Sequence, residues 1–103
     1  MYKTRMIRSF ADRDTEGLFH GRFARRLAQD MQRVAQRKLR QIHQAIRLSD
    51  LAAPPGNRLE ALRGDRAGQH SIRINDIRMN DLGRICFVWT DTGAEHVEIT
   101  DYH

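Results

Sequence analysis

The main change of periodicity in this sequence falls at Pro54-Pro55-Gly56, and that change constrains the fold more than any other feature. From Arg22 to about Leu48, apolar residues recur at steps of three and four, the pattern of one long amphipathic helix. After the Pro-Pro-Gly loop, apolar and polar residues alternate as they do in strands. Helices are therefore expected before the prolines and strands after them, and such segregation is typical of an α+β domain.

The predicted long helix has an apolar stripe and a basic face. The stripe comprises Leu27, Met31, Val34, Ala35, Leu39, Ile42, Ala45 and Ile46. The opposite face carries Arg25, Arg26, Arg33, Arg37, Arg40 and Arg47. Such a face is usually just solvated, because charged residues oppose a buried stripe, and is otherwise an RNA or partner surface. A short helix is expected before it, with Asp12, Asp14 and Thr15 as candidate caps and Gly21 as its stop.

Five segments have the alternation or the apolar run of a strand: "MIRSF" near the start, then "NRLEALRG", "QHSIRIN", "RICFVW" and "AEHVEITDYH". The expected order is strand, helix, helix and four strands, which gives a mainly antiparallel sheet with both helices on one face. At 103 residues, the chain is expected to be a single domain over 1–103, with residues 1–5 as an N-terminal extension.

One stretch is duplicated. Ile72–Asp76 reads "IRIND", and Ile77–Asp81 reads "IRMND". Because strand side chains alternate with period two, a five-residue repeat in one unbroken strand would send the two copies to opposite faces. We expect one copy to pair in the sheet and the other to lie in an enlarged hairpin loop over 72–81, ending near Gly83. The sequence does not indicate which copy pairs.

Charge is distributed unevenly along the chain. The net charge is +5, and all 18 Lys and Arg residues, 16 of them Arg, fall at or before Arg84, whereas four acids follow it. A basic small domain most often meets RNA, DNA or an acidic protein, although an Arg-rich surface can simply aid solubility. The single Cys86 fits a reducing, cytoplasmic setting. The start of the chain lacks a signal core, and no stretch is long and apolar enough for a membrane span.

The residue types offer little to a metal and end in an unusual tripeptide. The five histidines lack the paired spacing of a zinc site and Cys86 has no partner cysteine, so no metal or other cofactor is expected. The chain closes on Asp101, Tyr102 and His103. Taken alone, these three residues would more often be a solvated end than a site.

Four of these segments together resemble a known family. "MIRSF", "LEALRGDRAGQHSIRIN", "RICFVWTD" and the terminal "VEITDYH", from about Met6 to His103, are similar to the HigB toxins, or plasmid-maintenance killer proteins, of the RelE/ParE superfamily. The resemblance implies a RelE-like fold and a ribosome-dependent endoribonuclease that cuts messenger RNA. It also implies a HigA-type helix-turn-helix antitoxin, which neutralises the toxin and represses the shared operon, so that operator DNA is contacted only through the antitoxin.

The resemblance also implies site residues. In HigB-like enzymes the terminal Asp, Tyr and His belong to the active site, and these match Asp101, Tyr102 and His103. Two basic family positions match Arg63 and Arg84. The chain departs from the family pattern in three places. Glu60 stands where many members have His, Gly83 stands where a Trp is common, and the second five-residue copy looks like an insertion.

Metal-free RNA cleavage needs a base, an acid and cations around the scissile phosphate. We expect Arg63 and Arg84 to bind the phosphate and His103 to transfer protons, because its ordinary pKa is near 6.5. Asp101 would orient a partner or act as base, Tyr102 would stack on a base or bind the phosphate, and Glu60 is an alternative base. Further RNA contacts are expected from Arg66, Arg73, Arg33, Arg37 and Arg40.

Other interpretations remain open at this point. A ParE-like inhibitor of DNA gyrase shares the fold, although a pure binder has no need of the terminal triplet. A catalytically weakened domain that binds RNA or the antitoxin is the other alternative. Several residues also have purely structural interpretations, as turn-flanking or packing residues: Arg63, Arg66, His70, His96, Phe87 and Trp89.

Overall fold

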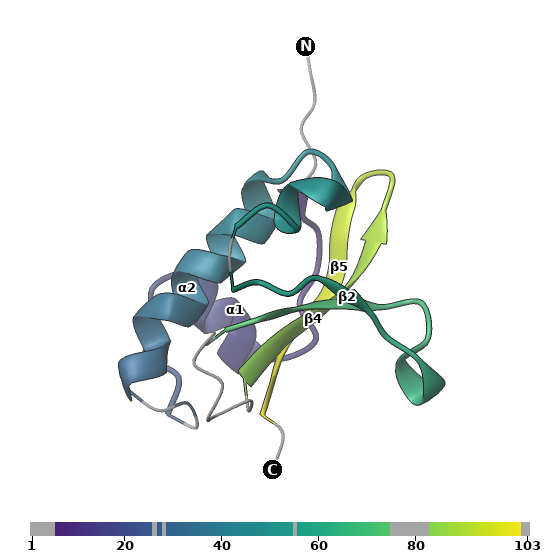
Figure 1. The fold of residues 1–103 in the computed structure, drawn as a ribbon. Helices are drawn as coiled ribbons and strands as arrows, with labels where there is room; N and C mark the ends of the chain where they lie inside the picture. Colours follow the sequence, from purple (N-terminus) through teal and green to yellow (C-terminus); the bar gives the residue numbers. More distant parts are fainter. Residues whose placement is uncertain (1–5, 26, 28, 55, 75–82, 102–103) are drawn as a thin grey trace.

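The computed structural model describes residues 6–25, 27, 29–54, 56–74 and 83–101, which form a five-stranded sheet and two α-helices (Figure 1). The elements are β1 (Met6–Ile7), α1 (Arg13–Phe19), α2 (Gln29–Gln44), β2 (Glu60–Ala61), β3 (His70–Arg73), β4 (Gly83–Thr90) and β5 (Gly93–Asp101), with 3-10 turns η1 (Leu48–Leu51) and η2 (Gly64–Arg66). The strand order is β1-β5-β4-β3-β2, with β1 parallel to β5 and all other neighbours antiparallel. The predicted α+β class, with a mainly antiparallel sheet, is confirmed.

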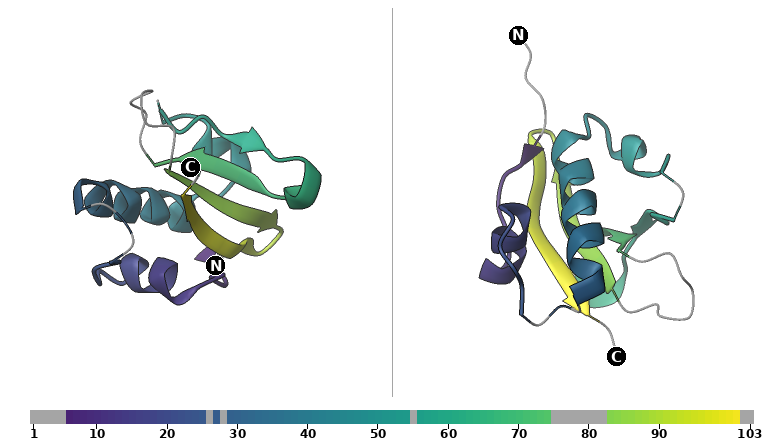
Figure 2. Two further views of the ribbon diagram at one scale, coloured as in Figure 1. Left: turned by 90° about the horizontal axis from the view of Figure 1, so that it is seen from below. Right: turned by 90° about the vertical axis from the view of Figure 1, so that its left-hand side faces the viewer.

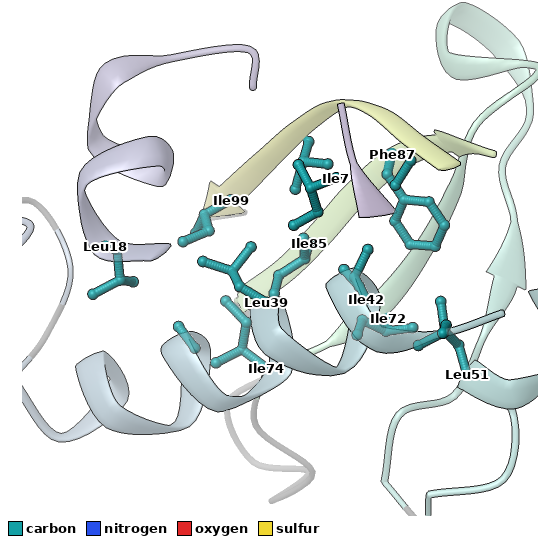
Figure 3. Packing of buried hydrophobic residues seen from close by; sticks show 14 of the residues in the cluster. Ile7, Leu18, Leu39, Ile42, Leu51, Ile72, Ile74, Ile85, Phe87 and Ile99 are labelled. Carbon is teal, nitrogen blue, oxygen red and sulfur yellow. The ribbon is translucent and has the colours of Figure 1, made fainter. Parts of the chain in front are cut away.

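Both helices lie on one side of the sheet, with α2 across its face and α1 beside it near β5 (Figure 2). Leu39 and Ile42 of α2 are fully buried, and they point at the buried Ile85 of the central strand β4 (Figure 3). Burying one such side chain stabilises the fold by about 1.5–3 kcal/mol. The predicted apolar stripe is thus the surface that fixes α2 to the sheet.

The long helix is shorter than the predicted range. At both of its ends, hydrogen bonds from side chains take the place of helical backbone hydrogen bonds. At the start, the amide of Gln32 accepts a hydrogen bond from Ala24 N at 3.0 Å and donates to the carbonyl oxygens of Ala24 and Leu27, both at 2.7 Å. At the other end, the carboxylate of Asp50 accepts hydrogen bonds from the backbone N–H groups that follow the helix. The predicted helical arginines Arg25 and Arg47 therefore lie outside α2.

The short helix begins as its sequence predicts. The Asp12 side chain accepts a hydrogen bond from Thr15 N at 2.7 Å and caps α1. Thr15 is fully buried, and its hydroxyl oxygen accepts a hydrogen bond from Ile99 N at 3.0 Å. This bond ties α1 to β5, the strand that carries the end of the described chain.

A buried polar network fixes the chain that leads into β2. Asn57 is fully buried, and its amide donates to Gln41 Oε1 at 3.1 Å and to Leu51 O at 3.0 Å. Its Oδ1 accepts a hydrogen bond from Lys38 Nζ at 2.5 Å. Its backbone oxygen accepts one from Arg73 N at 2.7 Å. Buried polar groups persist when they are satisfied in this way, so Asn57 connects α2, η1 and β3. The predicted strand over 57–64 is accordingly reduced to Glu60–Ala61.

The alternation predicted for the last strand is interrupted at His96. Opposite β4, the register shifts between Cys86 and Val88, and His96 adopts a positive φ of 54°. This is the geometry of a β-bulge, which inserts one extra residue into a strand. Without the bulge, Ala94 and Val97 would face opposite sides of the sheet, yet both are fully buried.

Gly93 permits the close approach of β1 to β5. It has a φ of 139°, and a Cβ atom built on it would lie 1.9 Å from the carbonyl oxygen of Met6, its partner in the parallel ladder. No flexible side chain can move to relieve a contact with backbone. A side chain at this position would therefore push β1 off the sheet.

The first copy of the five-residue repeat pairs in the sheet. Ile72 lies opposite Ile85 and Arg73 opposite Arg84, and the N–H of the buried Ile74 donates to Gly83 O at 3.0 Å. The second copy, residues 77–81, lies outside the described residues. The pairing keeps Arg84 in the central ladder, directly beside Arg73.

His43 on α2 holds the first strand through a neutral ring nitrogen. Its Nδ1 accepts a hydrogen bond from Ile7 N at 3.2 Å, and its ring packs on Phe19 with the centroids 5.1 Å apart. Burial, and then the positive charge of Arg40, lower the pKa of His43 from its ordinary 6.5. A protonated Nδ1 has no lone pair with which to accept the hydrogen bond.

We predict that stability falls in acid through His43. Because its pKa is lower in the folded chain than in the unfolded chain, the unfolded state binds more protons below pH 6.5. The contribution of this group is complete above that pH and is lost as the pH falls toward the folded-state pKa. In His43→Asn the amide oxygen can still accept the bond but does not titrate. Urea unfolding should therefore show the wild type losing free energy of unfolding relative to His43→Asn as the pH falls from about 7.5 to 5.5. Parallel pH profiles for the two proteins would contradict this assignment.

Candidate functional site

The sheet face opposite the helices carries polar and charged side chains from four strands. Since Ile72, Ile85 and Ile99 face the helices, the residues that alternate with them face the other side. This set, which we call the open face, comprises Glu60, Ser71, Arg73, Arg84, Glu98 and Thr100. Helices cover the other face of the sheet, so the open face is where a large ligand can approach the strands (Figure 2).

Arg84 is fixed at the centre of the open face. Its Nη1 lies 2.8 Å from Glu60 Oε1 and 2.9 Å from Ser71 Oγ. The side chain of Arg84 is 16% exposed, whereas that of Glu60 is 54% exposed. Ser71 is fully buried and pairs with Glu60 across β2 and β3, so the guanidinium extends from β4 over β3 to reach β2. A carboxylate and a hydroxyl thus hold one arginine in a defined orientation.

A second arginine reaches the same face from the loop after β2. Arg66 of η2 lies with its Nη1 2.9 Å from Gln69 Oε1 and 3.3 Å from Glu98 Oε1. About a third of each side chain in the Arg66–Glu98 pair is exposed. Because Glu98 belongs to β5, this contact draws the β2–β3 connection over the open face. Two arginine–glutamate pairs therefore hold two cations on one surface.

Arg63 does not join Arg84. Arg84 lies opposite Arg73, whereas Ala61 lies opposite His70, three residues or about 10 Å further along the sheet. Arg63 follows Ala61 in the same direction, as the exposed residue before η2. The structure brings Glu60, rather than Arg63, to the guanidinium of Arg84.

The last described residues of β5 lie beside Arg84. Thr100 lies opposite Arg84 and Asp101 opposite Gly83 in the β4–β5 ladder. The hydroxyl of Thr100 donates to the carbonyl oxygen of Arg84 at 3.4 Å. Two of the predicted catalytic residues, Tyr102 and His103, lie outside the described residues, and of Asp101 only the backbone is placed. In the described chain, strand β5 therefore ends at Asp101, whose backbone pairs with Gly83, the residue before Arg84.

The remaining predicted RNA contacts lie on a different surface. Arg33, Arg37 and Arg40 are exposed on α2, on the helix side of the sheet. The guanidinium carbon of Arg40 lies 5.8 Å from the centroid of the Phe19 ring. The predicted basic residues thus form two separate surfaces, the open face and the outer side of α2.

Sequence reasoning missed Ser71 and Glu98. Each is a small or acidic residue in an alternating strand, and alternation alone places both on the polar face. Their partners follow from strand register and from the path of η2, which single-strand patterns do not contain. Two histidines discussed above have structural surroundings: His70 stacks on Phe87 with centroids 6.3 Å apart, and His96 forms the bulge.

Over residues 6–25, 27, 29–54, 56–74 and 83–101, no three or more His, Cys, Asp or Glu side chains gather as a metal site would require. Among these same residues, no helix has the length and apolar character needed to cross a membrane.

Comparison with known proteins identifies the fold's relatives. A family model described as the RelE-like toxin of the type II toxin–antitoxin system HigB matches residues 8–103. A search of curated proteins returned no match. The family match spans both helices, the open face and the terminal triplet.

We predict that Glu60 and Arg84 are energetically coupled. A double-mutant cycle of Glu60→Gln, Arg84→Gln and the double variant should give a coupling of about 1 kcal/mol, because the pair is only partly shielded from water. The coupling should weaken in high salt. Urea unfolding measures it, and Glu95→Gln is the matched control, since Glu95 lies on β5 opposite Val88, away from Arg84. A Glu60 coupling no larger than that of Glu95 would show that the pair contributes nothing.

Proposed function

Because the chain belongs to the HigB-like family of RelE-like toxins from type II toxin–antitoxin systems, we propose that it is a ribosome-dependent endoribonuclease that cuts messenger RNA. The observation that supports the proposal is Arg84, which Glu60 and Ser71 hold on the open face, next to Thr100 in the β4–β5 ladder. On this proposal it acts in the cytoplasm and is neutralised by a HigA-type antitoxin.

Arg84 is suited to bind the scissile phosphate. A guanidinium presents five N–H donors in a planar fork that matches phosphate oxygens. Glu60 and Ser71 both bind Nη1, which fixes the plane of the group before RNA arrives. A preorganised cation stabilises the extra negative charge of the transition state without reorganising at the moment of reaction. We assign Glu60 this positioning role rather than that of base.

The reaction on this proposal is attack of the RNA 2′-oxygen on the neighbouring phosphorus. A base takes the 2′-hydroxyl proton, the new P–O bond forms as the bond to the 5′-oxygen breaks, and an acid protonates that oxygen. The products are a 2′,3′-cyclic phosphate and a 5′-hydroxyl. We assign proton transfer to His103, orientation or base function to Asp101, and base stacking or phosphate binding to Tyr102.

The other basic residues assist binding. Arg66 and Arg73 add positive charge to the open face near Arg84, and we propose that they contact the RNA backbone. Arg63, further along the sheet, would contact a more distant nucleotide. We propose that Arg33, Arg37 and Arg40 dock on ribosomal RNA, since they lie on the opposite side of the molecule from the site.

We predict that cleavage depends on His103 and Arg84. After induced expression, mapping of messenger RNA 5′ ends should show codon-phased cuts for the wild type. His103→Ala should lower cleavage by about 10²–10⁴-fold through loss of proton transfer, and Arg84→Ala by about 10²–10³-fold. Arg13→Ala, an exposed arginine on α1, is the matched control. Gyrase-linked DNA breaks with intact messenger RNA would favour the ParE-like alternative, and normal growth with intact RNA would favour an inactive binding domain.

Ribosome binding should depend on the α2 arginines. We expect the affinity to fall steeply with salt, and the triple variant Arg33→Glu, Arg37→Glu, Arg40→Glu to bind more weakly with a shallower salt slope. The matched control reverses three exposed arginines elsewhere, Arg8, Arg13 and Arg58, and changes the net charge equally. Co-sedimentation with ribosomes measures both, with unfolding midpoints to verify folding. Equal losses in the two triple variants would exclude α2 as the docking face.

A further inference from the structure

A hollow of about 240 Å3 lies between the end of α1 and the first half of α2, and its lining includes Leu18, Arg22, Phe23, Arg33 and Gln36. Its lining residues belong to α1, α2 and the connection between these helices, and none of them lies on the open face, so the hollow is not part of the proposed catalytic site. Pockets that hold drug-sized ligands measure about 300–1,000 Å3. This hollow is smaller, and its size suits one or two side chains of a partner rather than a cofactor.

Phe23 is the unusual residue of the hollow. Its side chain is 66% exposed, and with Ile46 it is one of the two exposed large apolar residues of the described chain. The backbone next to it is held in place, because Gln32 binds Ala24 and Leu27 through three hydrogen bonds. A fixed, exposed aromatic residue beside a hollow is typical of the anchor of a protein interface.

The hollow is lined by both apolar and basic side chains, and this combination favours one kind of partner. Leu18 is 3% exposed and supplies an apolar wall, as does Phe23. Arg22 and Arg33 carry two positive charges, and none of the residues lining the hollow is acidic. An occupant that complements this surface has an apolar side chain flanked by carboxylates. The net charge of +5 on the whole chain favours the same acidic partner at long range.

We propose that this hollow is the docking site for an acidic segment of the antitoxin, which inserts an apolar side chain beside Phe23 while its carboxylates pair with Arg22 and Arg33. The inference rests on the proposed function, which supplies the antitoxin as partner. A segment bound here covers Arg33, one of the arginines proposed to dock on the ribosome, and leaves Arg84 on the open face uncovered.

The test measures affinity for the antitoxin encoded in the same operon, by calorimetric titration of the full-length chain. Phe23→Ala should weaken binding by about 30-fold, as loss of an interface anchor does. Arg22→Glu should weaken it by about 10-fold or more and reduce its dependence on salt. The matched controls are Ile46→Ala, which truncates the other exposed apolar residue, and Arg13→Glu, which reverses an exposed arginine on α1. Both controls should bind as the wild type does, and unfolding midpoints verify that all variants fold.

Several results would overturn the docking site. These are wild-type affinity in Phe23→Ala and Arg22→Glu, equal losses in the controls, or no antitoxin binding by the wild type. Weakened ribosome binding with unchanged antitoxin binding would instead assign the hollow to RNA. The proposed nuclease function is tested separately, by measuring messenger RNA cleavage in the absence of the antitoxin. In that assay Phe23→Ala should cleave RNA as the wild type does. A chain that does not cut RNA but loses the antitoxin on Phe23→Ala retains the docking site and loses only the nuclease assignment.

Discussion

The pairing of Ile72 with Ile85 determines what both faces of this protein can do. It turns these two side chains toward α2, where both are fully buried, and it turns Ser71 and Arg84 toward the open face. Because side chains alternate along a strand, a slip of one residue would bury the charges and expose the core. The cost of exposing the buried isoleucines, about 1.5–3 kcal/mol each, keeps the register in place. The position of the candidate site is thus set by apolar packing on the far side of the sheet.

The duplicated segment and one glycine are connected through the same packing. Ile74, from the first copy, is buried beside Gly83, where an added Cβ would lie 3.2 Å from Ile74 Cδ1 and 2.6 Å from Met31 Cε. Ile74 and Met31 occupy the space beside the backbone of Gly83, so a larger residue at this position would have to displace them. The strand that carries Arg84 keeps its pairing although ten residues of repeated sequence precede it.

Local sequence patterns predicted the elements of the fold but not the contacts between distant ones. The three- and four-residue spacing of Leu39 and Ile42 predicted which side of α2 is buried, and alternation predicted that Ile72, Ile85 and Ile99 share a face. The ends of α2 were misplaced, because Gln32 and Asp50 replace helical hydrogen bonds with bonds from their side chains. The bulge at His96 was missed because positive φ at a non-glycine residue has no signature in a hydrophobic pattern. For the site, resemblance drew attention to Glu60 and Arg84, but only register shows that they touch.

The exposure of the two partners indicates how an RNA phosphate would enter the site. Arg84 is 16% exposed and is also held by the buried Ser71, whereas Glu60 is 54% exposed and lies on the two-residue edge strand β2. An ion pair with this much water contact is worth about 1 kcal/mol or less. A phosphate that offers two oxygens to the guanidinium competes well with such a partner. The carboxylate can then turn toward water while Ser71 keeps the arginine in place. On the proposed function, Arg84 would thus be oriented before RNA binds, and exchanging Glu60 for the phosphate would cost little free energy.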